Sequence, residues 1–241
     1  MPPADPKLPP LFTGHAVIAP VRPLDDAGRG AAAGAYGAGD FVWARATEHM
    51  RCALVLEPDV SLAIACQMSA LAHVAVAETL GHLCPPQIAV QCRWPATILV
   101  NGAACGSVVL AVPPTAPDAL PPWLVVAIDL TLTPSRADTE PGFRPNETSL
   151  ADEGAEIACT DLIEALATRL LAWLHTWQEA GFRPIHDDWL FRAEGRDADI
   201  VRDGVLGRVL GLDETGSLLF RPTGARHAVV HPMLPHVRSS A

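Results

Sequence analysis

One carboxylate stands inside an otherwise apolar segment. Asp129 lies within residues 123–132, whose sequence WLVVAIDLTL is rich in Val, Ile and Leu and therefore predicts a central strand. A carboxylate in such a strand needs partners, because burying an unpaired charge is costly. Asp129 is a hydrogen-bonded core acid, an acid of a functional site or a residue facing a sheet edge, and the sequence leaves these three readings open.

The supply of cations restricts the chemistry further. Lys7 is the only lysine in the chain, so all other positive side chains are Arg or His. Beyond residue 7, no lysine can act as an amine nucleophile, a general base or a phosphate contact. Arg45 and Arg51 flank the short segment 47–50 and are the nearest candidate anion contacts there.

The cysteines do not indicate a metal site. No CxxC pair and no Cys/His ligand spacing occurs, so we expect no bound metal. Most of them lie in apolar surroundings, where a free cysteine packs as a small hydrophobic residue. They are Cys52, Cys66, Cys84, Cys92, Cys105 and Cys159.

Composition limits the classes of partner. The net charge of −10 disfavours nucleic acid, which needs clustered Lys and Arg. The most apolar stretch, 61–80, is interrupted by Gln67, His73 and Glu78, and we interpret it as a buried helix and not as a membrane span. The N-terminus shows no secretory signal, so we expect a cytoplasmic protein.

A hairpin lies at the centre of the chain. Asn101-Gly102 is flanked by apolar runs, and this dipeptide is a strong signal for a two-residue turn. We expect strands at 11–20, 41–46, 51–57, 87–93, 98–101, 105–112 and 123–132, helices at 24–35, 61–80 and 159–181, and a shorter helix or irregular link at 182–190.

The pattern changes from about residue 195. Short strands at 205–212, 217–222 and 225–230 alternate with turn residues and predict a small antiparallel barrel. We therefore divide the chain into a Pro-rich flexible leader (1–10), a main domain (11–192) and a C-terminal domain (193–241).

Several dipeptides and glycines resemble a known family in their order. Trp94-Pro95, Asn101-Gly102 and Gly106 are similar to the core of biotin–protein and lipoate–protein ligases, which reads Lys-Trp-Pro-Asn-Asp, strand, turn, Lys, two small or apolar residues, Gly, strand. Thr148-Ser149-Leu150 before a long helix and the segment from Gly207 to Leu218 add to the likeness, which covers about residues 11–235. It implies a biotin ligase-like, class II synthetase-like α+β fold, namely a mixed sheet flanked by helices with an SH3-like C-terminal barrel. It also implies ligand-binding roles for Trp94, Asn101, Gly106 and Ser149.

The departures from this motif fall on the residues of the reaction. Arg93 replaces the Lys before Trp-Pro, Ala96-Thr97 replaces the Asn-Asp pair that helps to hold ATP and magnesium, and the catalytic Lys falls near Ala103. In the family a carboxylate is first joined to AMP and the acyl group then passes to a lysine of a carrier protein. Losing one preorganised charge contact costs about 3–4 kcal/mol in the barrier. Arg93 supplies part of the charge but cannot deprotonate, so we do not expect the standard reaction at a useful rate.

The resemblance also points to the walls of the ligand pocket. The Gly-x-Gly-x-Asn strand of the ligases matches Ala127, Asp129 and Thr131, where added side chains narrow the pocket. The family's Gly-Arg-Gly ligand loop is matched by Gly28-Arg29-Gly30 in one reading. In the other reading it has shrunk to 47–50, which is too short to wrap a phosphate with backbone N–H groups, and Arg45 and Arg51 remain beside it.

Two functions from different classes follow. One is a ligand- or partner-binding module without standard ATP-dependent ligase chemistry. The alternative is an active transferase of the biotin, lipoate or octanoate attachment class, in which Cys105 carries the acyl group if a nearby cation or His lowers its pKa. A packed strand cysteine is the other reading of Cys105.

The resemblance implies a small set of ligands and partners. Biotin, lipoate or octanoate are the candidate ligands, and ATP with magnesium is less favoured. The partner is a small-molecule carboxylate or an acyl-carrier protein, not nucleic acid or a membrane. A homodimer is also compatible with the family, and no residue decides it.

Overall fold

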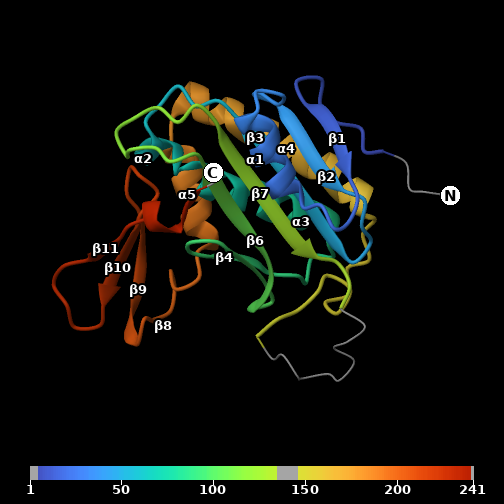
Figure 1. Cartoon of the computed structure of the whole chain (residues 1–241). Coiled ribbons are helices and arrows are strands. Elements are labelled where there is room, and N and C mark those ends of the chain that lie inside the picture. Colours follow the sequence, from blue (N-terminus) through green and yellow to red (C-terminus); the bar gives the residue numbers. More distant parts are fainter. Residues whose placement is uncertain (1–4, 135–145, 240–241) are drawn as a thin grey trace.

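The computed structural model describes residues 5–134 and 146–239, and its centre is one mixed β-sheet (Figure 1). The strands run in the order β1-β2-β3-β7-β6-β5-β4, with β12 beside β6. Their bounds are β1 Thr13–Val17, β2 Asp40–Ala44, β3 His49–Leu56, β4 Val90–Arg93, β5 Thr97–Val100, β6 Ala103–Val112, β7 Leu124–Thr131 and β12 Arg238–Ser239. The mixed α+β class expected from the sequence is confirmed.

The strand pairing follows the turn signals of the sequence. Asn101 and Gly102 have φ values of 48° and 87°, the left-handed conformation that a two-residue hairpin turn requires, and they join β5 to β6. The pairs β1–β2 and β6–β12 are parallel. The other neighbours in the sheet are antiparallel.

The two faces of the sheet are covered unequally. Helix α1 (Pro23–Ala32) packs through Ala27 and Ala31 on one face, against the small core that contains Val55, Val125 and Ala127. The other face carries the main core and is covered by α3 (Met68–Leu83), α4 (Cys159–Ala180) and α5 (Arg183–Arg192). Because α1 is short, part of its face of the sheet is left open to solvent.

The expected buried helix at 61–80 is present in two pieces. Helix α2 (Leu62–Ala65) leads into α3 through Cys66 and Gln67. By length and composition the stretch Leu62–Leu83 is apolar enough to cross a membrane, but 83% of its apolar window is buried inside the fold. It is the central core helix, in agreement with the interpretation from the sequence.

A second, smaller sheet follows α5. It contains β8 (Ile200–Arg202), β9 (Val205–Leu212), β10 (Leu218–Pro222) and β11 (Val229–His231), paired antiparallel in the order β11-β10-β9-β8. A 3₁₀ turn at Leu234–His236 then leads to β12, which returns to the main sheet. Short antiparallel strands were expected in this region, whereas a separate C-terminal domain with SH3-like character stays a prediction.

Polar contacts attach the small sheet to the main body. Trp94 Nε1 donates to the Gly216 carbonyl at 3.0 Å, and Gln67 Nε2 donates to the Glu214 carbonyl at 2.6 Å. Arg202 lies over the Trp94 ring at 4.5 Å. The turn that joins β9 to β10 is therefore held against α3 and the β4–β5 turn.

Three segments either differ from what the sequence predicts or lie partly outside the described residues. Gly28-Arg29-Gly30 lies within α1, so its interpretation as a ligand loop is wrong: those backbone N–H groups belong to a helix. Residues 5–10 have no helix or strand, yet Pro6 is buried and the Lys7 N–H donates to Glu164 Oε1 at 2.7 Å. Much of the long loop expected at 133–154 lies outside the described residues.

Candidate functional site

The open part of the α1 face carries a charged cluster on two central strands. In the β3–β7 pair, Arg51 stands opposite Asp129 and His49 stands opposite Thr131. Residues directly opposite in an antiparallel pair share a face, as do residues two apart in one strand. The pleat therefore brings His49, Arg51 and Asp129 together without help from any loop.

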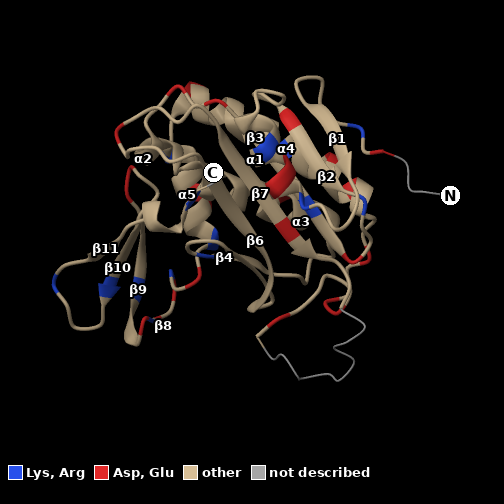
Figure 2. Ribbon diagram, in the orientation of Figure 1, with Lys and Arg blue, Asp and Glu red and all other residues tan. Residues whose placement is uncertain are grey.

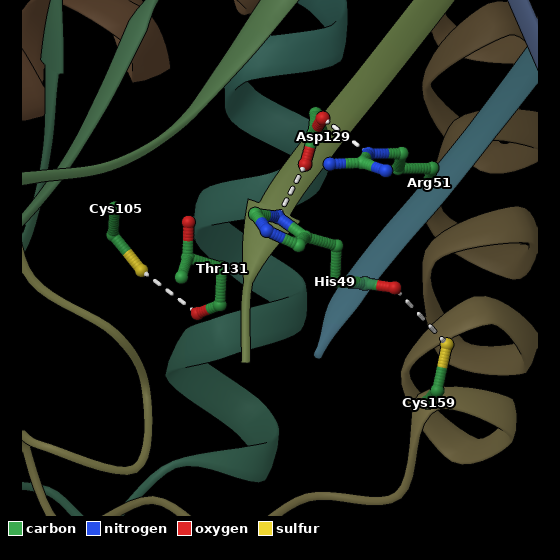
Figure 3. Close-up of polar contacts among 6 residues, drawn as sticks. All are labelled: His49, Arg51, Cys105, Asp129, Thr131 and Cys159. Atoms are coloured by element: carbon green, nitrogen blue, oxygen red, sulfur yellow. Dashed lines mark hydrogen bonds and ion pairs between the residues drawn. The ribbon is translucent and has the colours of Figure 1, made fainter. Parts of the chain in front are cut away.

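Asp129 joins the other two side chains through both carboxylate oxygens. Arg51 Nε donates to Oδ2 at 2.7 Å, and His49 Nδ1 lies 3.1 Å from Oδ1 (Figure 3). The side chains of His49, Arg51 and Asp129 are 31%, 34% and 41% exposed. Asp129 is thus a partnered acid on a partly open surface, and its place at an interior strand excludes the reading of an edge residue.

The contact to Asp129 determines the tautomer of His49. An ionised carboxylate can only accept hydrogen bonds, so Nδ1 carries the proton and Nε2 keeps its lone pair. Among the described residues, Nε2 has no hydrogen-bond partner and is not among the buried side-chain atoms that lack one. It therefore faces solvent.

An apolar row borders the charged cluster on the same face. Ala127 pairs with Ala53 of β3 and Val109 of β6. This row lies two residues along the strands from the row that Asp129 forms with Arg51 and Ser107. Ala53 and Ala127 are 0% and 9% exposed and belong to the core that packs under α1, whereas Val109 is partly exposed. In this apolar strip (Ala53, Ala127 and Val109), Val109 is therefore the side chain that reaches the open surface beside the charged cluster.

The connection that precedes the cluster is very short. Residues 45–48 link β2 to β3, and β3 begins at His49, so the link is as short as the loop expected at 47–50 but begins two residues earlier. Within it, the Glu48 carbonyl accepts from the N–H groups of Leu132 and Thr133, and Arg45 pairs with Asp5. Neither anion contact expected from the sequence is free: Arg45 is bound to Asp5 and Arg51 to Asp129.

Cys105 is a packed thiol on the other side of β6. A bulge between β5 and β6 directs it into the main core, where it is 1% exposed and its Sγ lies 3.5 Å from the Thr131 carbonyl (Figure 3). Burial, with smaller contributions from the neighbouring Glu153 and Asp152, raises the pKa of Cys105 to about 12. These surroundings do not supply the cation or His that an acyl-carrying thiolate needs.

Two other candidate residues lie at the junction with the small sheet. Arg93 forms a bidentate pair with Glu194, with N–O distances of 2.6 and 2.7 Å, and this hydrogen-bonded pair raises the pKa of Arg93. The Trp94 ring is buried beneath Arg202 and beside His236. The structure therefore places both away from the charged cluster on β3 and β7.

The remaining candidate residues make structural contacts in and around β6. The Asn101 side chain accepts from the Ala89 N–H at 2.9 Å and donates to Glu153 at 2.6 Å. Ser149 is buried, and its hydroxyl bonds to the carboxylate and the N–H of Asp152. A Cβ on Gly106 would lie 2.3 Å from the Asp129 carbonyl. Of the residues expected at the site, the structure brings together Arg51, Ala127 and Asp129, with Thr131 at the edge of the cluster.

Sequence reasoning missed His49. We expected it in a loop, because the apolar run that signals the strand starts only at Met50. Polar residues at alternate positions, His49 and Arg51, before the apolar Ala53 were the available signal, since a period of two marks one face of a strand.

Solved structures define the class of this fold. Biotin protein ligase from Aquifex aeolicus superimposes with a TM-score of 0.71 at 14% identity, covering 91% of this chain and 96% of that one. A biotin protein ligase-like protein of unknown function from Silicibacter sp. TM1040 gives a TM-score of 0.85 at 35% identity over 96% of this chain and 99% of that one. The fold is that of the biotin protein ligases.

Sequence comparison gives the family. The model of the Biotin/lipoate A/B protein ligase family matches residues 8–191, and a biotin–[acetyl-CoA-carboxylase] ligase of Paracoccus denitrificans is 26% identical over 191 residues, which is 78% of this chain and 80% of that protein. The chain belongs to the Biotin/lipoate A/B protein ligase family.

Proposed function

We propose that this member of the family binds a biotin-, lipoate- or octanoate-type ligand on the open face of β3, β7 and β6, and does not carry out the ATP-dependent ligase reaction. The observation that carries the proposal is the position of Asp129, whose carboxylate engages Arg51 and His49. In place of free cations, the site presents Arg51 and His49, both already bound to an acid.

ATP with magnesium does not fit these residues. Adenylate formation needs cations and N–H donors that stabilise charge on the phosphates. Asp129 stands where the family strand carries glycine, and the link 45–48 is too short to wrap a phosphate with backbone N–H groups. Arg93, the substitute for a family lysine, is bound to Glu194. We therefore propose no ATP-dependent reaction at this site.

The ligand class is supported by the surface beside the cluster. β7 carries one acidic residue among uncharged ones (Figure 2), and beside it Val109 of β6 is partly exposed. An acyl or valeryl chain would gain about 25 cal/mol for each Å² of apolar surface that it buries against Val109. The polar head would lie over Arg51 and His49. The partner that presents the group is a small-molecule carboxylate or an acyl-carrier protein, and we place the protein in the cytoplasm.

The domain plan is part of the same proposal. Residues 11–192 form the ligand-binding part, and residues 193–241 form the C-terminal part, which we take to be SH3-like. The catalytic alternative through Cys105 receives no support from its buried surroundings.

Thermal unfolding of the full chain with biotin, lipoate or octanoate, each with and without MgATP, tests the proposal. A ligand at 100 times its Kd stabilises by about 2.7 kcal/mol, which raises Tm by roughly 5–10 °C. We expect one ligand to raise Tm, no further rise with MgATP and no ligand-dependent exchange of pyrophosphate into ATP. Such an exchange would refute the loss of ligase chemistry.

A pair of variants locates the binding. Val109→Asp places a charge on the apolar strip and should abolish the ligand-induced rise in Tm. Val201→Asp changes a side chain that is 69% exposed on the small sheet and should leave the rise intact. Equal responses of the two variants would mean that the ligand binds elsewhere.

A further inference from the structure

His49 has a reactive atom that nothing in the described part of the chain uses. Its Nδ1 is held by Asp129, while Nε2 keeps a lone pair and faces solvent. A histidine oriented by a carboxylate in this way is the usual form of a general base.

We propose that His49 and Asp129 form a general-base pair that hydrolyses an acyl thioester or ester bound on this face. The inference rests on the proposed function, because the acyl group must first bind on the open face of β3, β7 and β6. It assigns to the site a reaction that removes an activated acyl group, whereas a ligase attaches one.

Each side chain of the cluster has a distinct part in this reaction. Asp129 fixes the tautomer and the orientation of His49 and would stabilise the imidazolium that forms. Arg51 binds the second oxygen of Asp129 through Nε and so holds the carboxylate in place. The positive guanidinium is also the nearest group able to stabilise an oxyanion on the substrate.

The chemical step balances without a cofactor. A water oxygen bonds to the acyl carbonyl carbon as His49 Nε2 accepts a water proton, and the carbonyl becomes an oxyanion. Collapse of this intermediate breaks the bond to the thiol sulfur or ester oxygen. The leaving group takes the proton from His49, and the products are a carboxylic acid and a free thiol or alcohol.

Water is the nucleophile because the nearby thiols contact backbone carbonyls and not the His49 ring. Cys105 Sγ points to the Thr131 carbonyl, and Cys159 Sγ lies 4.0 Å from the His49 carbonyl, not from its ring (Figure 3). With water as nucleophile and one cation beside the reaction centre, the substrate needs a good leaving group. This requirement selects a thioester or activated ester over an amide.

The test is hydrolysis of S-octanoyl-N-acetylcysteamine by the full chain, with released octanoate measured by chromatography. His49→Gln should lower kcat by about 100- to 10,000-fold, the usual contribution of a general base, with little change in KM. Asp129→Asn should also lower kcat and alter the pH profile, because an amide can hold the wrong tautomer. His175→Gln, an exposed histidine on α4, is the matched control and should keep the wild-type rate.

The outcomes separate this inference from the proposed function. If octanoate raises Tm but the thioester is not hydrolysed, or is hydrolysed equally by the His49→Gln and His175→Gln variants, the hydrolase is refuted and the binding function stands. If octanoate binding and hydrolysis are both absent, both proposals fail for this acyl class. Loss of turnover in His49→Gln and Asp129→Asn, with folding and octanoate binding retained, supports the general-base pair.

Discussion

Gly106 was expected to be a ligand-binding residue, and the structure shows what the fold itself requires of it. A Cβ there would lie 2.3 Å from the Asp129 carbonyl and 2.5 Å from Leu130 Cδ2, so one of the central strands would have to move. We expect Gly106→Ala to lower the free energy of unfolding by about 2–3 kcal/mol, measured by urea denaturation.

The matched control is Gly81→Ala on the exposed end of α3, where an added Cβ meets nothing within 4 Å. Alanine is the better helix former, so this variant should be neutral or more stable by about 0.5–1 kcal/mol. A Gly106→Ala protein as stable as the control would show that β6 and β7 can separate without cost.

His73 should make the free energy of unfolding depend on pH in the acid range. It is 1% exposed in the core, its Nδ1 contacts the Ser69 carbonyl at 2.8 Å, and burial lowers its pKa from 6.5 to about 4. Between these two values the unfolded chain binds a proton and the folded chain does not. The free energy of unfolding should therefore fall by roughly 3 kcal/mol as the pH drops from 6.5 to 4.

Denaturation of the His73→Leu variant across this pH range isolates the effect from that of the carboxylates. Its free energy of unfolding should change less with pH than that of the wild type, whereas His175→Leu should follow the wild type. Parallel curves for the His73→Leu variant and the wild type would exclude His73 as the source.

At the scale of the elements, the features predicted well were those whose cause is local. The turn at Asn101-Gly102 follows from two residues that tolerate positive φ, and the helix 159–181 follows from periodicity that ends at Gly181. Residues 49–50 were assigned to a loop because their strand state depends on pairing with Thr131 and Leu130 of β7, which are some eighty positions away. The Asp129 contacts needed that register and could not be read from spacing.

Gln67 shows how one polar side chain can hold several elements together. It lies between α2 and α3, donates to the Glu214 carbonyl at 2.6 Å and accepts from Trp177 Nε1 of α4 at 2.6 Å. Gln67→Ala would remove both hydrogen bonds from a part-buried place, so we expect a loss of about 1–3 kcal/mol in urea denaturation. Gln178→Ala, an exposed neighbour on α4, should change stability by less than about 0.5 kcal/mol.

At the scale of the whole molecule, the family fold is retained at low sequence identity. The TM-score of 0.71 to a biotin protein ligase at 14% identity shows that the sheet tolerates wide changes in sequence, because a core needs apolar residues of suitable size more than particular ones. A site needs particular residues, and in the site that we propose these are Arg51, Asp129 and His49.

The connections between the two sheets predict how the chain unfolds. Trp94 is 6% exposed, donates to the Gly216 carbonyl and lies under Arg202, while β12 pairs with Ala111 and Val112 of the main sheet. Neither part keeps its buried surface if the other unfolds. We expect a single calorimetric transition for the full chain, with equal calorimetric and van't Hoff enthalpies.

Trp94→Ala tests this coupling. Loss of a buried indole costs about 3–5 kcal/mol, and in a coupled molecule it should lower the one Tm without dividing the transition. Phe191→Ala removes an aromatic ring that is 68% exposed and should leave Tm nearly unchanged. Two separate transitions in the wild type would instead mean that residues 193–241 fold independently of the main sheet, and that the contacts of Trp94 attach two stable units and do not hold one unit together.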